Sequence, residues 1–259
     1  MWNPTQYARF ADERSRPFFE LVDRIGAIDP GSVIDLGCGS GALSATLAER
    51  WPTAAIVGVD SDAAMLTAAS QHATDRVSFE PGDIATWRPA NPVDVIVSNA
   101  AFQWVPEHLE MLPDLGAHLS PGGWLAFQVP GNLDDPHHQA IREVRRRDHW
   151  AAQPSLALLP ERTHSSSSAV TYTDRLANIG YEVDAWETTY VHILNGVDPI
   201  LEWVKGTGLR PVLNALPDDA SRAEFCAELA PLLREAYPTR PYGTPFPFRR
   251  VFVVARRTA

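Results

Sequence analysis

The chain has 259 residues, a formal net charge of -10 and a pI near 5.2, so its overall field repels polyanions and nucleic acid is excluded as an expected partner. Its hydrophobic fraction of 45% is typical of a globular protein with a large core, yet no apolar run is long enough to cross a membrane. Two cysteines, Cys38 and Cys226, are too few for a disulfide framework and lack zinc-ligand spacing, and the N-terminus has no signal pattern. We therefore expect a cytoplasmic protein with no membrane, metal or obligate protein partner.

The first half of the chain alternates helix and strand patterns. A helix with proline in its first turn is expected at residues 15–28, ended by Asp29-Pro30-Gly31. Apolar strands are predicted at residues 32–36, 56–60, 77–80, 93–99 and 124–129, separated by helices at 42–51, 63–72 and 106–119. This order predicts an α/β fold with a doubly wound, mostly parallel sheet.

Beyond residue 130 the pattern is less regular. The expected elements are a helix at 136–150, a mobile loop containing the serines 165–168, a helix at 173–179, a strand at 182–192, helices at 201–206 and 219–237, and a strand at 248–254. The long insertion before the final strand is expected to form a helical cap. The predicted segments are an N-terminal lid or helix (1–30), a nucleotide-binding core (31–130), a cap helix and mobile loop (131–170), a core helix and strand (171–192), a helical cap insertion (193–246) and a final core strand (247–259).

A glycine-rich stretch follows the first predicted strand and opens the next helix. The strand ends in Asp35-Leu36 and is followed by Gly37-Cys38-Gly39-Ser40-Gly41, a loop whose backbone can approach a ligand closely. A glycine loop between a strand and a helix can bind a dinucleotide, with Asp60 hydrogen-bonded to the ribose. The same loop can also bind S-adenosylmethionine. Asp35 favours the second, because a carboxylate attracts an ammonium group and repels a pyrophosphate. S-adenosylmethionine carries the ammonium and no phosphate.

Acidic and amide residues also follow the next predicted strands. Asp60 is expected to accept hydrogen bonds from the ribose hydroxyls. Asp83 is expected to accept a hydrogen bond from the adenine amine, and Ile84 to pack against the adenine ring. Asn99 is expected to lie beside the methionine part of the cofactor. The carboxyl ends of parallel strands open toward one crevice. The predicted cofactor-binding set is Tyr7, Asp35, Gly37, Gly39, Asp60, Ser61, Asp83, Ile84 and Asn99.

The sequence resembles the class I S-adenosylmethionine-dependent methyltransferases. The residues that carry the resemblance lie within 32–130 and are Asp35-Leu36-Gly37-Cys38-Gly39-Ser40-Gly41, Asp60, Gly82-Asp83-Ile84, Ser98-Asn99 and Leu119-Ser120-Pro121-Gly122-Gly123. This family implies a seven-stranded, Rossmann-like sheet whose last strand is antiparallel.

A narrower resemblance, to the trans-aconitate 2-methyltransferase family, extends over nearly the whole chain. Its matching pieces are Trp2-Asn3-Pro4 with Tyr7, Phe10 to Arg14, Asn99 to Trp104, Trp203 to Pro211, and Phe246 to Arg250. The family implies methyl esterification of one carboxylate of trans-aconitate, with S-adenosylmethionine as methyl donor. The serine-rich segment at 163–170 looks unlike the family.

A carboxylate acceptor determines which catalytic and binding groups the active site needs. The nucleophile is already ionised at neutral pH, so no general base is expected and catalysis would come from positioning the two reactants and excluding water. Three carboxylates call for cations, and guanidinium groups recognise carboxylates bidentately. The candidate acceptor-binding residues are Arg14, Trp203, Arg210, Tyr242, Arg249 and Arg250. We favour Arg210 and one of Arg249 and Arg250, because adjacent strand residues face opposite sides.

Other functions stay open at this point. One is methyl transfer to another small carboxylic acid or to an oxygen or nitrogen nucleophile, although a phenol or amine would normally need a base that the sequence does not reveal. A second is a nicotinamide-dependent oxidoreductase on a Rossmann domain. A third is a protein that binds a cofactor or a partner without catalysis.

Overall fold

The computed structural model describes residues 11–161 and 166–258, and of residues 11–14 the backbone alone. The chain divides into two compact units. Unit 1 comprises the described parts of Met1–Gly131, Ser166–Thr188 and Arg250–Ala259, and unit 2 those of Asn132–Ser165 and Thr189–Arg249. Each unit is therefore built from separate stretches of sequence, because the chain leaves unit 1 after Gly131 and returns to it twice.

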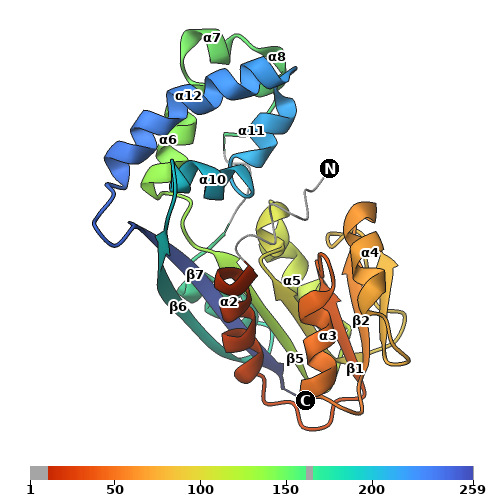
Figure 1. The fold of residues 1–259 in the computed structure, drawn as a ribbon. Helices are drawn as coiled ribbons and strands as arrows, with labels where there is room; N and C mark the ends of the chain where they lie inside the picture. Colours follow the sequence, from red (N-terminus) through yellow and green to blue (C-terminus); the bar gives the residue numbers. More distant parts are fainter. Residues whose placement is uncertain (1–10, 162–165, 259) are drawn as a thin grey trace. The chain divides into compact units, whose positions relative to one another are not determined.

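A seven-stranded sheet organises unit 1 (Figure 1). Its strands are β1 (Ser32–Leu36), β2 (Ala55–Asp60), β3 (Val77–Pro81), β4 (Val93–Asn99), β5 (Leu119–Pro130), β6 (Tyr181–Leu194) and β7 (Thr244–Arg257), in the order β3-β2-β1-β4-β5-β7-β6. Residues 189–194 of β6 and 244–249 of β7 belong to unit 2. The pairs β1–β2, β1–β4, β2–β3 and β4–β5 are parallel, whereas β7 runs antiparallel to β5. The predicted doubly wound, mostly parallel sheet with an antiparallel last strand is confirmed.

The central strands are buried on both faces. Val33 in β1 and Val95, Ile96 and Val97 in β4 are all 0% exposed. Strands rich in β-branched residues, as both are, suit positions that are covered by helices on both sides. The predicted bounds of these two strands, 32–36 and 93–99, agree with the structure.

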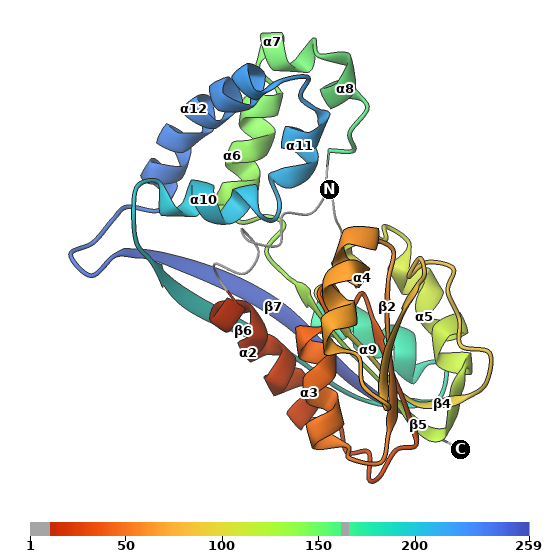
Figure 2. The same ribbon diagram turned by 45° about the vertical axis from the view of Figure 1, so that its right-hand side comes forward.

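Helices cover both faces of the sheet in unit 1. They are α2 (Ala11–Asp23), α3 (Ala42–Arg50), α4 (Ala63–Ala69), α5 (His108–Ala117) and α9 (Ala169–Ala177), with short 3-10 turns η1 (Ser70–His72) and η2 (Phe102–Trp104). Helices α2, α3 and α4 lie on one face and α5 and α9 on the other (Figures 1 and 2). Asp62 caps α4, since its Oδ1 accepts from the backbone N–H groups of Ala64 and Met65 at 2.8 and 3.2 Å.

Two predicted helices of unit 1 differ most from the observed bounds. Helix α2 starts at Ala11 and ends at Asp23, so Pro17 lies inside it and not in its first turn. Phe18 and Leu21, both 0% exposed, anchor this helix despite the backbone hydrogen bond that a proline cannot donate. Helix α9 begins at Ala169 and not at Thr173, because the Ser168 side chain accepts from Thr171 N and caps it. The serine-rich segment predicted to be a loop thus ends in a helix cap.

Unit 2 is mainly helical. Its helices are α6 (Pro136–Arg145), α7 (Asp148–Ala151), α8 (Pro154–Ala157), α10 (Pro199–Lys205), α11 (Arg210–Ala215) and α12 (Asp219–Ala236). The single helix predicted at 136–150 is wrong: Arg147 is extended, so the helix is interrupted and Trp150 packs edge-on against Phe225 at 5.2 Å. The short helices α8 and α11 were not predicted, because six residues or fewer carry little periodicity.

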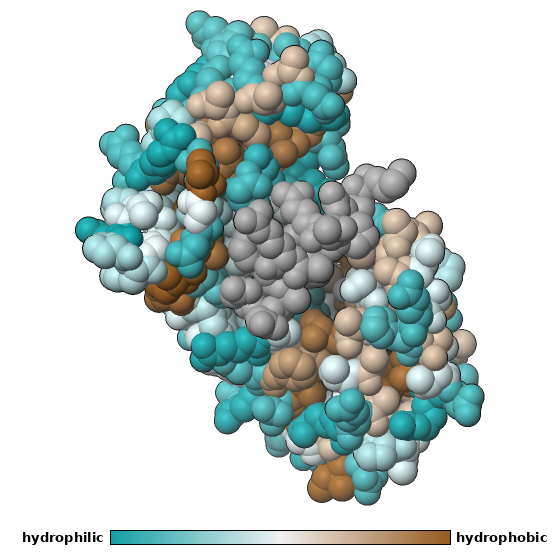
Figure 3. Space-filling model, in the orientation of Figure 1, coloured by the Kyte–Doolittle hydropathy of each residue, from teal (hydrophilic) through white to brown (hydrophobic). Residues whose placement is uncertain are grey.

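An aromatic core holds unit 2 together. Trp203 stacks on His192 with ring centroids 4.8 Å apart and meets Phe246 edge-on at 5.7 Å. On the face drawn in Figure 3, hydrophilic residues surround smaller hydrophobic patches in both units. None of the described helices is both long and apolar enough to cross a membrane.

Candidate active site

The glycine loop between β1 and α3 has the backbone conformation that its sequence demands. Gly37, Gly39 and Gly41 have φ angles of 79°, 57° and 77°, a region that side chains disfavour. A Cβ on Gly37 would lie 2.3 Å from that of Ala101, so this glycine lets the end of β4 approach the loop. By contrast, a Cβ on Gly39 would meet no atom of the described residues within 4 Å. Among these residues, the backbone at Gly39 therefore has space beside it in which a ligand can lie.

Asp35 is a buried carboxylate beneath this loop. Its side chain is 2% exposed, and Oδ2 accepts from Ser44 Oγ on α3 at 2.5 Å. The other oxygen, Oδ1, has no hydrogen-bond partner among the described residues. Burial raises the pKa of Asp35 to about 6, the Ser44 hydrogen bond opposes this rise, and the nearby charge of Asp60 adds to it. A cationic group at Oδ1 would relieve both the missing hydrogen bond and the buried charge.

Asp60 ends β2 and closes the loop from the other side. Its Oδ2 accepts from Gly39 N and its Oδ1 from Asp62 N, each at 2.9 Å. These bonds hold the carboxylate in one orientation beside the open backbone of Gly39. Each oxygen can still accept one further hydrogen bond. Burial and the charges of Asp35 and Asp60 raise the pKa of the Cys38 thiol, so Cys38 is a neutral packing residue of the loop.

The turn after β3 contains Asp83 and Ile84. Asp83 is exposed, and its Oδ1 accepts from Ala85 N at 2.9 Å. Ile84 is half-buried, and its Cδ1 lies 3.7 Å from the position that a Cβ on Gly37 would occupy. Of the two residues predicted to contact adenine, Ile84 thus lies next to the glycine loop. Ser61, which follows Asp60, is exposed.

The carboxyl end of β4 is held tightly against β1. Ser98 is 0% exposed and donates from Oγ to the carbonyl of Leu36 at 2.7 Å. After Asn99 the chain turns sharply, since Ala100 has a φ of 54°, a conformation that costs a non-glycine residue about 1 kcal/mol. Such strain is often found where a site needs a particular backbone direction.

A chain of side-chain hydrogen bonds runs from Asn99 across the sheet. Gln128 on β5 donates from Nε2 to Asn99 Oδ1 at 2.5 Å, and its Oε1 accepts from Arg250 Nη1 on β7 at 3.2 Å. Gln128 and Arg250 are 1% and 5% exposed. Arg249, the neighbour of Arg250, is exposed, as strand alternation predicts.

The other predicted acceptor residues lie in unit 2 or outside the described side chains. Trp203 is 1% exposed in the aromatic core, Arg210 is the first residue of α11, and Tyr242 is 63% exposed. Burial raises the pKa of Asp135, and the charge of Arg249, which is in the same unit, opposes that rise. Tyr7 lies outside the described residues, and the side chain of Arg14 is likewise not described.

The sequence of this chain is similar to those of known methyltransferases. A family profile described as a methyltransferase domain matches residues 7–185. The curated trans-aconitate 2-methyltransferase of Streptomyces avermitilis is 48% identical over 266 residues, which cover 100% of this chain and 97% of the relative. That of a Mycobacterium species (strain KMS) is 49% identical over 258 residues, 99% of either chain. This chain belongs to the trans-aconitate 2-methyltransferase family.

The fold of this family member is also that of more distant methyltransferases. The structure of coclaurine N-methyltransferase bound to N-methylheliamine and SAH aligns with a TM-score of 0.57 at 16% identity, covering 94% of this chain and 72% of that one. At such identity the likeness shows the fold alone.

Two polar residues of this trans-aconitate methyltransferase family member were missed by the sequence analysis. Ser44 lies on the buried side of α3, three residues after Gly41, and Gln128 lies within a strand of apolar residues. A buried polar side chain needs a partner, so a polar residue at an inward position was the available signal. The partners themselves, Asp35 for Ser44 and Arg250 for Gln128, come from other elements and depend on the fold.

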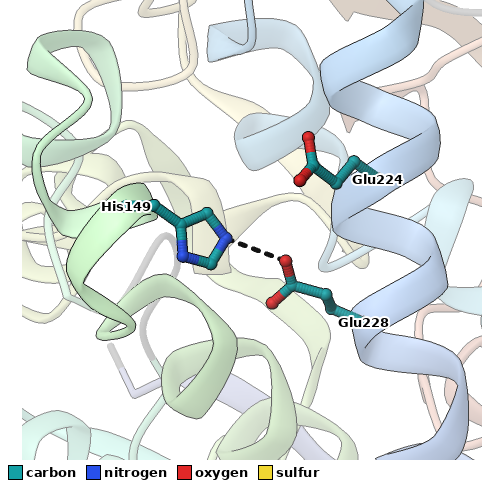
Figure 4. A group of neighbouring side chains, drawn as sticks. All are labelled: His149, Glu224 and Glu228. Carbon is teal, nitrogen blue, oxygen red and sulfur yellow. Dashed lines mark hydrogen bonds and ion pairs between the residues drawn. The ribbon is translucent and has the colours of Figure 1, made fainter.

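A group of potential metal ligands also lies in unit 2 of this family member. His149 on α7 and Glu224 and Glu228 on α12 have ligand atoms within 4.8 Å of one another (Figure 4). The Glu228 carboxylate, however, already accepts from Arg147 Nη1 at 2.6 Å and binds His149 Nε2 at 2.8 Å. Both of its oxygens are thus engaged, and the group is explained as an ion-paired contact between α7 and α12.

Proposed function

We propose that this chain transfers the methyl group of S-adenosylmethionine to one carboxylate of trans-aconitate and produces a monomethyl ester. The observation that carries the proposal is the full-length identity of 48–49% to curated trans-aconitate 2-methyltransferases, combined with the intact glycine-loop site. The two cysteines are unpaired, in keeping with action in a reducing compartment such as the cytoplasm.

The residues of unit 1 fit the methyl donor. Asp35 would accept a hydrogen bond from its ammonium group at Oδ1, the buried oxygen without a partner among the described residues. Asp60 and Ser61 would bind the ribose, since both Asp60 oxygens keep one acceptor position each. We assign the adenine to Asp83 and Ile84 and the methionine part to Asn99. The open side of Gly39 leaves room for the ligand against the backbone.

Catalysis at this site requires that the two reactants be held in the correct geometry. One acceptor carboxylate oxygen forms a bond to the methyl carbon as the carbon–sulfur bond breaks, and the sulfonium leaves as a neutral thioether. The carboxylate carries no proton at neutral pH, so no side chain has to remove one. The protein contributes by holding the oxygen in line with the methyl group and by excluding water.

Arg250 is the residue of unit 1 that we assign to an acceptor carboxylate. Its guanidinium is buried, and charge-assisted hydrogen bonds are strongest where water is scarce. For five further residues, contact with the acceptor stays a prediction made from the sequence: Arg14, Trp203, Arg210, Tyr242 and Arg249.

An acceptor panel tests the function. The protein is incubated with methyl-labelled S-adenosylmethionine and, in separate reactions, trans-aconitate, a monocarboxylic acid, a phenol and an amine. We expect label in an alkali-labile ester from trans-aconitate, and little or none from the phenol and the amine, because the site needs no base. Cofactor binding without any ester would contradict the assignment of the acceptor. Transfer to the phenol or amine at a higher rate would favour the alternative methyltransferase reaction.

A further inference from the structure

Gln128 is a polar side chain in an otherwise apolar part of β5. Its neighbours Phe127 and Val129 are both 0% exposed, and Gln128 itself is 1% exposed. Burying a side-chain amide is unfavourable unless its donor and its acceptor both find partners. Gln128 meets this condition by bonding Asn99 on one side and Arg250 on the other.

The direction of these hydrogen bonds follows from the chemistry of arginine. A guanidinium only donates, so the atom of Gln128 beside Arg250 must be its oxygen. The NH2 group of Gln128 then faces Asn99, whose oxygen has to accept. Asn99 therefore presents its own NH2 group, a donor, away from Gln128. Neither amide titrates near neutral pH, so this orientation does not depend on pH.

The three residues lie side by side on neighbouring strands of unit 1. Asn99 and Gln128 are directly paired across β4 and β5, and Arg250 pairs with Pro130, two residues beyond Gln128 on β5. Gln128 thus lies between the end of β4, to which we assign the methionine part of the cofactor, and the arginine that we assign to the acceptor.

We propose that Gln128 is a positioning residue that sets the guanidinium of Arg250 for an acceptor carboxylate and orients the Asn99 amide as a donor. A neutral amide holds Arg250 without cancelling its positive charge. A glutamate at the same position would form a buried ion pair with Arg250, and the acceptor would then have to compete with it. A neutral Gln128 therefore places no negative charge beside Arg250 that would compete with an anionic acceptor. This inference rests on the proposed function.

Two substitutions at Gln128 test the inference through the Michaelis constants. Gln128→Glu should raise KM for trans-aconitate by about tenfold or more, since it neutralises Arg250 with nearly unchanged shape. Gln128→Met has a similar volume and removes both hydrogen bonds, so it should raise the same KM by about threefold to tenfold. KM for S-adenosylmethionine should change less in both variants. The exposed Gln139, which donates to the carbonyl of Asp134, offers the matched control Gln139→Glu, for which both KM values should stay as in the wild type.

A double-mutant cycle separates positioning from a general loss of structure. In an Arg250→Met background, adding Gln128→Glu should raise the acceptor KM far less than in the wild type, because the residue that it acts through is gone. Equal effects in both backgrounds, or Gln128 variants with the wild-type acceptor KM, would overturn the inference while the proposed function stands. A wild-type protein that makes no ester would overturn the proposed function and the inference together. If Gln128→Glu does not fold, the inference is tested by Gln128→Met and by the double-mutant cycle that combines it with Arg250→Met.

Discussion

Replacing Asp35 with asparagine should move stability and cofactor affinity in opposite directions. In the ligand-free protein, burial raises the pKa of Asp35 from 3.8 to about 6. The folded state thus binds this proton more tightly than the unfolded chain, so the free energy of unfolding falls as pH rises from about 4 to about 6. Above that range the buried negative charge costs about 3 kcal/mol.

Asp35→Asn removes this charge and keeps the shape. The amide oxygen can still accept from Ser44 Oγ, but the new NH2 group replaces Oδ1, which is buried and has no hydrogen-bond partner among the described residues, at a cost of about 1–2 kcal/mol. The net gain at pH 7.5 is about 1–2 kcal/mol, or a rise in Tm of roughly 2–6 °C for a protein of this size. Loss of a charge-assisted hydrogen bond to the ammonium should weaken S-adenosylmethionine binding by about 1.5–3 kcal/mol, which is roughly 10- to 150-fold in Kd.

Calorimetric titration and thermal unfolding of the two proteins check both effects. The affinity of the wild type should also weaken as pH falls below about 6, because Asp35 becomes protonated, whereas that of Asp35→Asn should not. Asp94 is a suitable control, since its carboxylate accepts from Gly31 N and Ser32 N at the opposite end of the sheet. Asp94→Asn should lower stability and leave the affinity within about twofold. Unchanged affinity in Asp35→Asn would refute the placement of the ammonium.

Further outcomes follow from other residues. Gly37→Ala should destabilise the fold by about 2–4 kcal/mol in denaturant unfolding, because its Cβ would meet Ala101 at 2.3 Å. Gly39→Ala, which has open space, should cost only about 1 kcal/mol of stability but weaken cofactor binding in calorimetry; the reverse pattern would contradict the site. Arg250→Lys should raise the acceptor KM about tenfold through loss of the planar fork, and more than Arg249→Lys does. A chelator should leave the methylation rate unchanged, because Glu228 is already paired; inactivation would point to a required metal.

Much of unit 1 was predictable from sequence because its central strands are short, mainly apolar segments. The bounds of β1 and β4 follow from their β-branched residues, and the carboxyl ends of these parallel strands necessarily share one edge. The hydrogen bond from Gly39 N to the Asp60 carboxylate could not be predicted from the strand pattern, since it depends on how β2 and the loop approach each other.

Unit 2 was less predictable for physical reasons. The aromatic stacking of His192 on Trp203 joins a strand to a helix, and neither position stands out in the local pattern. The break in the helix predicted at 136–150 comes with tertiary contacts, namely the burial of Trp150 and the bond from Arg147 to Glu228. Local propensity would have continued the helix, so packing against α12 decides the structure there.

The identity of the methylated product tests the central claim most directly. Trans-aconitate, S-adenosylmethionine and the protein are incubated, and the acceptor is analysed by mass spectrometry before and after mild alkali. We expect a product heavier by one CH2 group that reverts to trans-aconitate in alkali, as a methyl ester must. An acceptor that stays unmodified, or a methyl group that survives alkali, would contradict the claim.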